Sequence, residues 1–297
     1  GHEGRWFGVF ATADVLGFGT GPLVAGVIRQ VISFHAVFVA MATMMGISAV
    51  IVTMALPRKQ PVRERMEGDA DEYGVPFLQA LKDRAVLALT IHMTLVSLSF
   101  GSMLSFLGLR LEDDLHIGPA LIGVAFSTQD LTGGVAQPLF GRLADRFERR
   151  LLVAIGLTSL GALLMSLGLL TSFALVVLWL FLMGASNAIA QVSASAIQVV
   201  AGRRVGMGTV LGLGSAGNGL GIVFGSLIGG VLKDLWGIPA AFFFGGLGIA
   251  SGAPLFLYLT RGLKLSEYEL ARPGLHGPAA PEKAIADLSA GGGGGGS

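Results

Sequence analysis

The chain has 297 residues, of which 53% are hydrophobic and 13% charged, and it contains no cysteine. The charged share is about half of that in a soluble domain, and a net charge of +1 argues against nucleic-acid binding. The lack of cysteine excludes a disulfide scaffold, and the 46 glycines lack the three-residue period of collagen. The composition therefore indicates a helical protein that crosses a membrane several times.

Eight apolar segments lie between clusters of charged residues. Each is long enough to cross a hydrocarbon core of about 30 Å as a helix, and none alternates as the strands of an outer-membrane barrel do. In chain order they are 6–28, 34–56, 85–109, 117–140, 151–170, 173–192, 205–231 and 238–260. The predicted fold class is an all-α polytopic membrane protein.

Basic residues are distributed unevenly between the predicted loops. Seventeen of the 20 Lys and Arg residues lie before the first helix or after the second, fourth, sixth and eighth, whereas the alternate loops hold Arg29, Arg110 and Lys233. Loops rich in Lys and Arg stay in the cytoplasm. We therefore expect a multi-pass protein of the plasma or inner membrane with both ends of this chain in the cytoplasm.

Two segments outside the predicted membrane helices have their own character. Residues 58–84 form the longest internal loop, and within it 77–84 is expected to form a short helix at the membrane surface. Residues 262–297 are rich in Pro, Ala and charge and end in six glycines and a serine. This composition predicts a disordered tail that ends in a flexible linker or an added sequence.

An internal repeat relates the first two helices to the last two at a spacing of 204 residues. At this shift Gly17 aligns with Gly221, and the polar Asp14 aligns with the polar Asn218. Six helices separate the two copies, so both have the same orientation. If the repeating unit has six helices, the first two helices end a preceding unit, and four more would lie upstream.

A cytoplasmic loop carries a motif that resembles a known family. Residues 141–150 read GRLADRFERR, which is similar to the loop motif G-x-L-A-D-R-x-G-R-R of the major facilitator superfamily. In that family the motif joins the second and third helices of each half. Here it joins the fourth and fifth predicted helices, which are the second and third of the six-helix unit. The sequence departs at Glu148, where the family has glycine. The matching residues are Gly141, Asp145, Arg146, Arg149 and Arg150.

A glycine–proline pattern in the first helix supports the same resemblance. It comprises Gly17, Gly21, Pro22 and Gly26 and is similar to the fifth-helix motif of the drug:proton antiporter branch. The resemblance implies a secondary active transporter that works by alternating access, with proton-coupled efflux of small hydrophobic or cationic compounds. It implies the lipid bilayer, a small-molecule substrate and protons as partners, and a monomer when full length. No cofactor, metal or nucleic acid is expected.

The resemblance also implies a domain organisation. The eight helices would correspond to the fifth to twelfth of a twelve-helix protein. Residues 1–57 would then end the N-terminal bundle, 58–84 would link the bundles, 85–261 would form the C-terminal bundle, and 262–297 would be a cytoplasmic tail.

Two interpretations of the motif loop remain open. Its arginines could simply anchor the cytoplasmic side, as the topology rule requires. Alternatively, Asp145 caps the N-terminus of a neighbouring helix or pairs with an arginine, and this contact breaks when the transporter opens. Only the family resemblance favours such a gating role.

Glycines also mark the seventh predicted helix. Residues 212–217 match the dinucleotide motif G-x-G-x-x-G, but a real one follows a strand in a soluble unit, so no cofactor site is expected. Glycines instead recur every four residues, which predicts a smooth face for close contact with a neighbouring helix, either sliding or static. They are Gly217, Gly221, Gly225 and Gly229, with a shorter version at Gly17, Gly21 and Ala25.

Polar residues inside the membrane are costly to bury and often functional. The second, fifth and eighth helices contain no Asp, Glu, Asn, Gln, Lys, Arg or His beyond their ends. This is expected for lipid-facing helices, and the resemblance implies the same outer position for the matching helices of the superfamily. The other helices are expected to line a shared cavity. Its candidate substrate contacts are His92, Gln129, Gln137, Asn187, Gln191 and Asn218.

Asp130 lies near the middle of its helix, where a charged aspartate costs roughly 3 kcal/mol on insertion scales. Protonation avoids part of that cost, so Asp130, and Asp14 nearer the cytoplasmic end of the first helix, are candidates for coupling proton entry to substrate exit. The alternative is that each aspartate simply hydrogen-bonds a neighbouring helix.

Other functions compete with proton-coupled export. A metabolite or sugar permease would share the same fold, and a non-transporting sensor or scaffold would need no polar cavity. A membrane-embedded enzyme would need a nucleophile–base pair or a metal cluster. Only His92 of the five histidines lies well inside a predicted helix, and no H-E-x-x-H occurs, so no catalytic residue is predicted.

Overall fold

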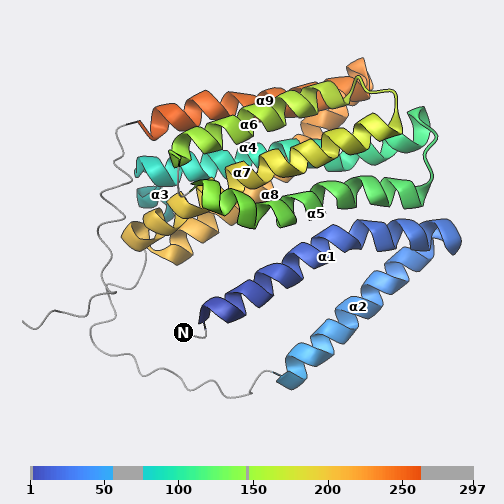
Figure 1. Cartoon of the computed structure of the whole chain (residues 1–297), viewed down its shortest axis with the longest axis horizontal. Helices are drawn as coiled ribbons and strands as arrows, with labels where there is room; N and C mark the ends of the chain where they lie inside the picture. Colours follow the sequence, from blue (N-terminus) through green and yellow to red (C-terminus); the bar gives the residue numbers. More distant parts are fainter. Residues whose placement is uncertain (1–2, 56–75, 145–146, 262–297) are drawn as a thin grey trace, which may run out of the picture. The chain divides into compact units, whose positions relative to one another are not determined.

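The computed structural model describes residues 3–55, 76–144 and 147–261 (Figure 1). These residues belong to one compact unit, and their regular elements are all helical. The elements are α1 (Glu3–Val31), α2 (Phe34–Ala55), α3 (Phe77–Ala80), α4 (Arg84–Leu109), the π-helical turn η2 (Arg110–Asp114), α5 (Pro119–Ala144), α6 (Arg149–Leu167), α7 (Phe173–Val205), α8 (Met207–Trp236) and α9 (Ile238–Leu259). The predicted all-α fold is confirmed for this part of the chain, and the predicted tail and most of the predicted inter-bundle loop lie outside it.

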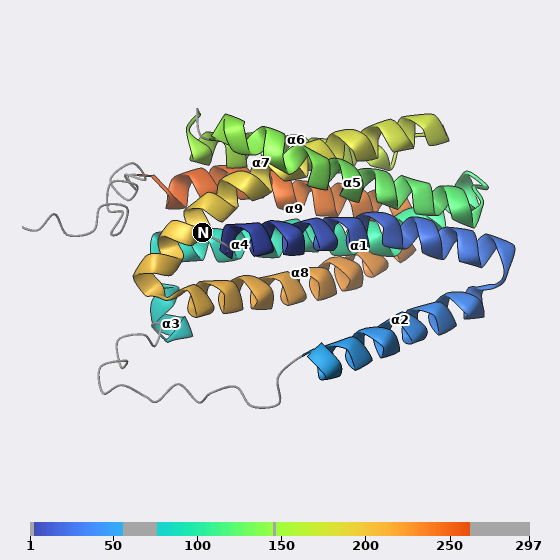
Figure 2. The ribbon, with the colours of Figure 1, turned by 60° about the horizontal axis from the view of Figure 1, so that its bottom comes forward.

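All eight predicted membrane segments form long helices. Six are long and apolar enough to span a bilayer by length and composition: α2, α4 with its continuation through η2, α6, α7, α8 and α9. The other two, α1 and α5, have 29 and 26 residues but are less apolar. They are the helices that contain Asp14 and Asp130, and they pack along each other (Figures 1 and 2).

Several helix boundaries differ by a few residues from the sequence prediction, and two of the differences are informative. α7 continues past 192 to Val205, because Arg203 and Arg204 in its last turn favour the negative end of the helix dipole, and Gly206 ends it with φ of 101°. The predicted surface helix at 77–84 is only the single turn α3. Asp83 ends it by capping α4, since its carboxylate accepts a hydrogen bond from the backbone N–H of Ala85 at 2.8 Å.

α4 packs between α8 and α9 (Figure 2). Towards α9, the hydroxyl groups of Ser99 and Ser102 donate to the carbonyl oxygens of Gly245 and Ala241 at 2.6 and 2.8 Å. Towards α8, the hydroxyl of Ser105 donates to that of Ser226 at 2.9 Å. Such interhelical hydrogen bonds contribute about 0.6 kcal/mol each in a membrane protein, so the serines of α4 orient both neighbours.

The glycine stripe of α8 faces α4, and its four members, Gly217, Gly221, Gly225 and Gly229, are buried. A Cβ at Gly221 would collide with the carbonyl oxygen of Thr94, and one at Gly225 with that of Leu98. α4 has a matching small residue at Gly101, where an added Cβ would lie 2.5 Å from the carbonyl oxygen of Ile222. The stripe therefore lets two helix backbones touch within one bundle.

α1 contacts α5 through Gly26 of the predicted glycine–proline motif and through Gly123 of α5, which was not predicted. A Cβ at Gly26 would collide with the carbonyl oxygen of Pro119, and one at Gly123 with that of Pro22. A Cβ at Gly17 or Gly21 would meet no atom within 4 Å, so the packing predicted for these two residues is not present in the described chain. The reason is rotational, since Gly17 and Gly21 lie on another side of α1 from the face that touches α5.

The wholly apolar helices have an exposed apolar face. α2 has no buried residue and contacts α1 near the turn that joins them (Figure 1). α6 and α9 pack against each other but expose Ile155 and Leu247, which are 57% and 52% accessible. This arrangement fits helices that face lipid on one side.

Candidate functional site

Two adjoining hollows lie between α1 and helices α4 to α8. The larger has a volume of about 290 Å³ and is mainly apolar, with Phe100, Met103, Leu160, Met183 and Ile222 in its lining. The smaller has a volume of about 180 Å³ and has Asp130 and Gln137 in its lining. Phe18, Gln129 and Asn187 line both hollows, so the apolar and the acidic space meet at these three side chains.

Most of the polar residues predicted for a cavity line these hollows. Gln129 and Asn187 line both, Asn218 lines the larger, and Gln137 lines the smaller. Gln191 lines neither of the two. The helix spacing explains the grouping, because Asp130, Gly134 and Gln137 follow one face of α5 and all three line the smaller hollow.

Gln129 is positioned by the contact between α5 and α7. A Cβ at Gly184 of α7 would collide with the carbonyl oxygen of Gln129, so the two backbones touch at this point. The side chain is 8% exposed, and its Oε1 accepts no hydrogen bond from the described residues. An unpaired buried acceptor costs about 1–3 kcal/mol, and a donor group on a ligand in either hollow would relieve that cost.

Asp130 is half-buried on α5 and, within the described chain, forms no hydrogen bond or ion pair. The polar groups that share its hollow are the amides of Gln129, Gln137 and Asn187, which carry no charge. The side chain of Asp14, the other predicted proton-coupling residue, lies outside the part that the structure describes.

His92 does not line either of the two hollows, and its role as a cavity residue stays a prediction. It is 1% exposed on α4, and its ring meets the ring of Phe256 edge-on at a centroid distance of 5.9 Å. Neither ring nitrogen has a hydrogen-bond partner among the described residues.

Ser127 was not identified from the sequence, although it helps to hold α1 in place. Pro22 interrupts the hydrogen-bond ladder of α1 because it lacks an N–H group. The next N–H, that of Leu23, donates to the hydroxyl of Ser127 on α5 at 3.1 Å. The sequence signal was the proline itself, since a proline in a membrane helix requires polar partners nearby.

The last turn of α1 contacts η2 and the start of α5 through polar side chains. The guanidinium of Arg29 pairs with the carboxylate of Glu112 in η2 and lies 5.7 Å from the ring centroid of Phe34. The side-chain oxygen of Gln30 accepts a hydrogen bond from the backbone N–H of Ala120 at 3.0 Å. The predicted topology assigns both turns to the face opposite the cytoplasm.

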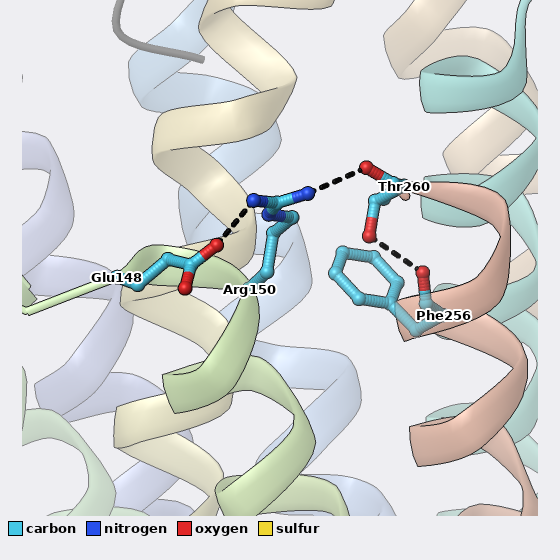
Figure 3. A network of polar contacts seen from close by, with 4 residues as sticks. All are labelled: Glu148, Arg150, Phe256 and Thr260. Atoms are coloured by element: carbon cyan, nitrogen blue, oxygen red, sulfur yellow. Dashed lines mark hydrogen bonds and ion pairs between the residues drawn. The ribbon is translucent and has the colours of Figure 1, made fainter. Parts of the chain in front are cut away.

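The motif loop is described only in part, because Asp145 and Arg146 lie outside the described residues and the predicted cap by Asp145 stays a prediction. Arg150 donates to the carbonyl oxygen of Thr260 at 2.8 Å and pairs with Glu148 (Figure 3). Thr260 ends α9, so the guanidinium meets the negative end of that helix. The motif thus fastens the start of α6 to the end of α9.

Glu148 replaces the glycine of the family motif without backbone strain. Its φ is −66°, a conformation that any residue adopts, so the turn does not require glycine. Gly141, at the other end of the motif, lies in α5, where an added Cβ would be 3.9 Å from Val192 of α7.

An ion pair joins the end of α7 to the start of α4. The guanidinium of Arg204 lies 3.1 Å from the carboxylate of Asp83, which also caps α4.

Among the described residues, no group of three or more His, Asp or Glu side chains could hold a metal ion.

Two comparisons with known proteins agree with these features. The family model for the Major Facilitator Superfamily matches residues 1–112 and 89–289. The curated protein "Multidrug resistance protein MdtG" of Proteus mirabilis (strain HI4320) is 28% identical over 137 residues, which are 46% of this chain and 33% of that relative. The matched stretch thus spans about a third of the relative's length. The chain belongs to the Major Facilitator Superfamily, as a multi-pass helical membrane protein.

Proposed function

We propose that this chain is part of a secondary active transporter that exports small hydrophobic or cationic compounds in exchange for protons, by alternating access. The observation that carries the proposal is the contact between an apolar hollow and an acidic one at Phe18, Gln129 and Asn187. The name of the relative from Proteus mirabilis, a multidrug resistance protein, supports the same substrate class.

The larger hollow suits an apolar compound of varied shape. Its volume of about 290 Å³ is near the lower limit for small-molecule sites, which span about 300–1,000 Å³. Met103 and Met183 have flexible, polarisable side chains that adapt to different ligands. Phe18 and Phe100 offer ring faces that attract a cation. These residues favour an amphipathic cation as cargo.

Asp130 is the proposed proton-coupling residue, with Asp14 as the second candidate. A carboxylate in the membrane requires either a proton or a cation as partner, and Asp130 has no basic partner in the described chain. A proton would fill this role after substrate leaves, and a cationic substrate would displace it.

The proposed complete transporter has twelve helices, with four ahead of this chain, and works as a monomer in the plasma or inner membrane with both ends of this chain in the cytoplasm. The aligned helices α2 and α9 have 22 residues each, which supports the repeat. The repeat aligns Gly17 and Gly21 of α1 with Gly221 and Gly225 of α8, which touch α4. By analogy, Gly17 and Gly21 would contact the first helix of the preceding unit. Reading the gene upstream tests this, because four further membrane helices are expected.

The motif loop is proposed to act as a cytoplasmic gate as well as an anchor. Its contact between Arg150 and Thr260 joins α6 and α9 within one bundle. The gate itself would depend on Asp145 and its partner across the bundle interface.

The alternative function is a metabolite or sugar permease of the same superfamily. The carboxamides of Gln129, Asn187 and Asn218 in the larger hollow favour this alternative, because amides both donate to and accept from hydroxyl groups. A sugar that blocks uptake of an apolar cation in competition would support the permease.

The deciding experiment uses the full-length transporter in liposomes with an imposed pH gradient and the amphipathic cation octyltrimethylammonium. Transport is expected to follow the gradient and to be lost in Asp130→Asn, which keeps the shape but not the charge. Asp113→Asn removes an exposed carboxylate of η2 and should transport normally. Unchanged gradient-driven transport by Asp130→Asn would reject the coupling role.

A further inference from the structure

Phe18 of α1 occupies the boundary between the two hollows. It lines both of them, as do Gln129 from α5 and Asn187 from α7. Phe18 is the bulky, rigid member of this group, because a phenyl ring has few rotamers and no polar atom. The other two are amides, which offer hydrogen-bond donors and acceptors at the same boundary.

The position of Phe18 is set by close helix contacts on both sides of it. One turn before it, Val15 lies so close to Gly134 that an added Cβ there would collide with its side chain. Directly after it, a Cβ at Gly19 would collide with the side chain of Leu131. These contacts leave the backbone of α1 little freedom to slide or rotate along α5 beside Gln129, whereas Phe18 itself is 67% exposed.

The backbone at Phe18 is also unusual. Pro22 lies four residues later and has no N–H, so the carbonyl oxygen of Phe18 lacks its regular helical donor. Beyond the proline, the hydrogen bond from Leu23 to Ser127 holds α1 against α5. The boundary therefore combines a largely exposed ring on a restrained backbone with a carbonyl acceptor that a ligand or water could use.

We propose that Phe18 is a specificity-determining residue, an aromatic partition between the substrate hollow and the hollow of Asp130. The apolar part of a substrate lies against the ring in the larger hollow. Only a narrow polar or cationic end passes between the ring and the amides of Gln129 and Asn187 to reach Asp130. Compounds whose charge is enclosed by bulky groups are held back by the ring. This inference rests on the proposed transport function and adds the residue that selects among its substrates.

The test compares two cations in the full-length transporter in liposomes. Octyltrimethylammonium has a small cationic end on a slender tail, and the charge of tetraphenylphosphonium is enclosed by four rings. The wild type is expected to prefer octyltrimethylammonium in kcat/KM. Phe18→Ala opens the partition and should reduce that preference about tenfold, since misfit in an apolar site discriminates by about 10–200-fold. Phe181→Ala removes a ring on α7 that lines neither hollow and should keep the wild-type preference.

The outcomes separate this inference from the proposed function. Transport of neither cation by the wild type would reject the function. Normal transport with an unchanged preference in Phe18→Ala would reject the partition alone.

A second measurement does not depend on the alanine variant being folded and active. The chain has no cysteine, so Phe18→Cys introduces one defined thiol, whose alkylation by a maleimide is followed on its own peptide by mass spectrometry. Octyltrimethylammonium is expected to slow this reaction several-fold, and to leave Phe181→Cys unaffected. Equal alkylation of Phe18→Cys with and without the cation would overturn the proposal.

Discussion

The guanidinium of Arg29, near the end of α1, lies 2.5 Å from the carboxylate of Glu112 in η2. The pair joins two turns that are 83 residues apart in the sequence, on the face that the predicted topology places outside. A hydrogen bond between Gln30 and the backbone of Ala120 reinforces it. In a transporter that alternates between two faces, contacts of this kind must break whenever the outer face opens.

Loss of the Arg29–Glu112 pair should change the balance between conformations more than the stability. The two side chains are 35% and 42% exposed, and exposed pairs contribute about 0–1 kcal/mol. Glu112→Gln is therefore expected to leave the melting temperature nearly unchanged but to raise the labelling of a cysteine at Ala120 from outside. The charge swap Arg29→Glu with Glu112→Arg should restore low labelling. Equal labelling in all variants would show that the pair is not a latch.

The α4–α8 contact predicts that an alanine substitution affects stability differently at two glycines of α8. Gly225→Ala places a methyl group against the carbonyl oxygen of Leu98, and such overpacking is expected to destabilise by about 1–3 kcal/mol. Gly219 has no atom within 4 Å of an added Cβ, so Gly219→Ala should be neutral or stabilise by up to about 1 kcal/mol. Thermal unfolding in detergent measures both. A similar melting temperature for the two variants would contradict the packing described.

Removal of the Ser127 hydroxyl should weaken the junction between α1 and α5. Ser127→Ala leaves the N–H of Leu23 without its side-chain acceptor, and the expected destabilisation is about 1 kcal/mol, within the range of interhelical hydrogen bonds in membranes. Thr128→Ser is the control, because the hydroxyl of Thr128 bonds only within its own helix, to Val124. Hydrogen exchange of α1 should rise in Ser127→Ala alone, and equal exchange in both variants would argue against this role.

The Arg150 contact with α9 predicts a difference between two replacements. Arg150→Gln removes the charge that meets the end of α9, and Arg150→Lys keeps the charge but cannot contact Thr260 and Glu148 with a planar fork. Protection of the end of α9 from proteolysis is expected to decrease in both, more in Arg150→Gln. Glu148→Gly, which restores the residue of the family motif, should not stabilise the protein, because φ at this position is already −66°. A clear stabilisation by this glycine would contradict the backbone geometry.

Substitution of Gln129 is expected to weaken ligand binding without lowering the stability of the protein. Its Oε1 is buried and unpaired in the described chain, so Gln129→Leu should leave the melting temperature unchanged or raise it slightly. The same change is expected to weaken binding of octyltrimethylammonium, measured by isothermal titration calorimetry, by about tenfold, the effect of a hydrogen bond of about 1.4 kcal/mol. Gln191→Leu changes an amide that lines neither hollow and is the control. Undiminished binding by Gln129→Leu would exclude this amide from the site.

Much of the candidate site was predictable from spacing. Asp130 and Gln137 follow one face of α5, and Asn187 and Asn218 are among the few polar residues of α7 and α8. A residue that is polar in an apolar helix stands out, because lipid cannot solvate it. Phe18 did not stand out, since an aromatic residue in a membrane helix is ordinary until its neighbours are known. Ser127 was missed for the same reason, because its role depends on a proline 105 positions earlier in another helix.

The helices themselves followed from the amino-acid sequence. In lipid every backbone N–H and C=O must be satisfied within its own segment, so a long apolar run has to be helical, and α4 and α9 begin and end within one residue of their predicted bounds. Only the tertiary structure decides which face of each helix contacts its neighbours. Spacing shows that Gly17 and Gly21, or Val15 and Gly19, share a face of α1, but α5 contacts only the second face. His92 likewise became a buried neighbour of Phe256. A helix can turn about its own axis without changing its internal hydrogen bonds, so only packing against other helices selects which face lines a cavity.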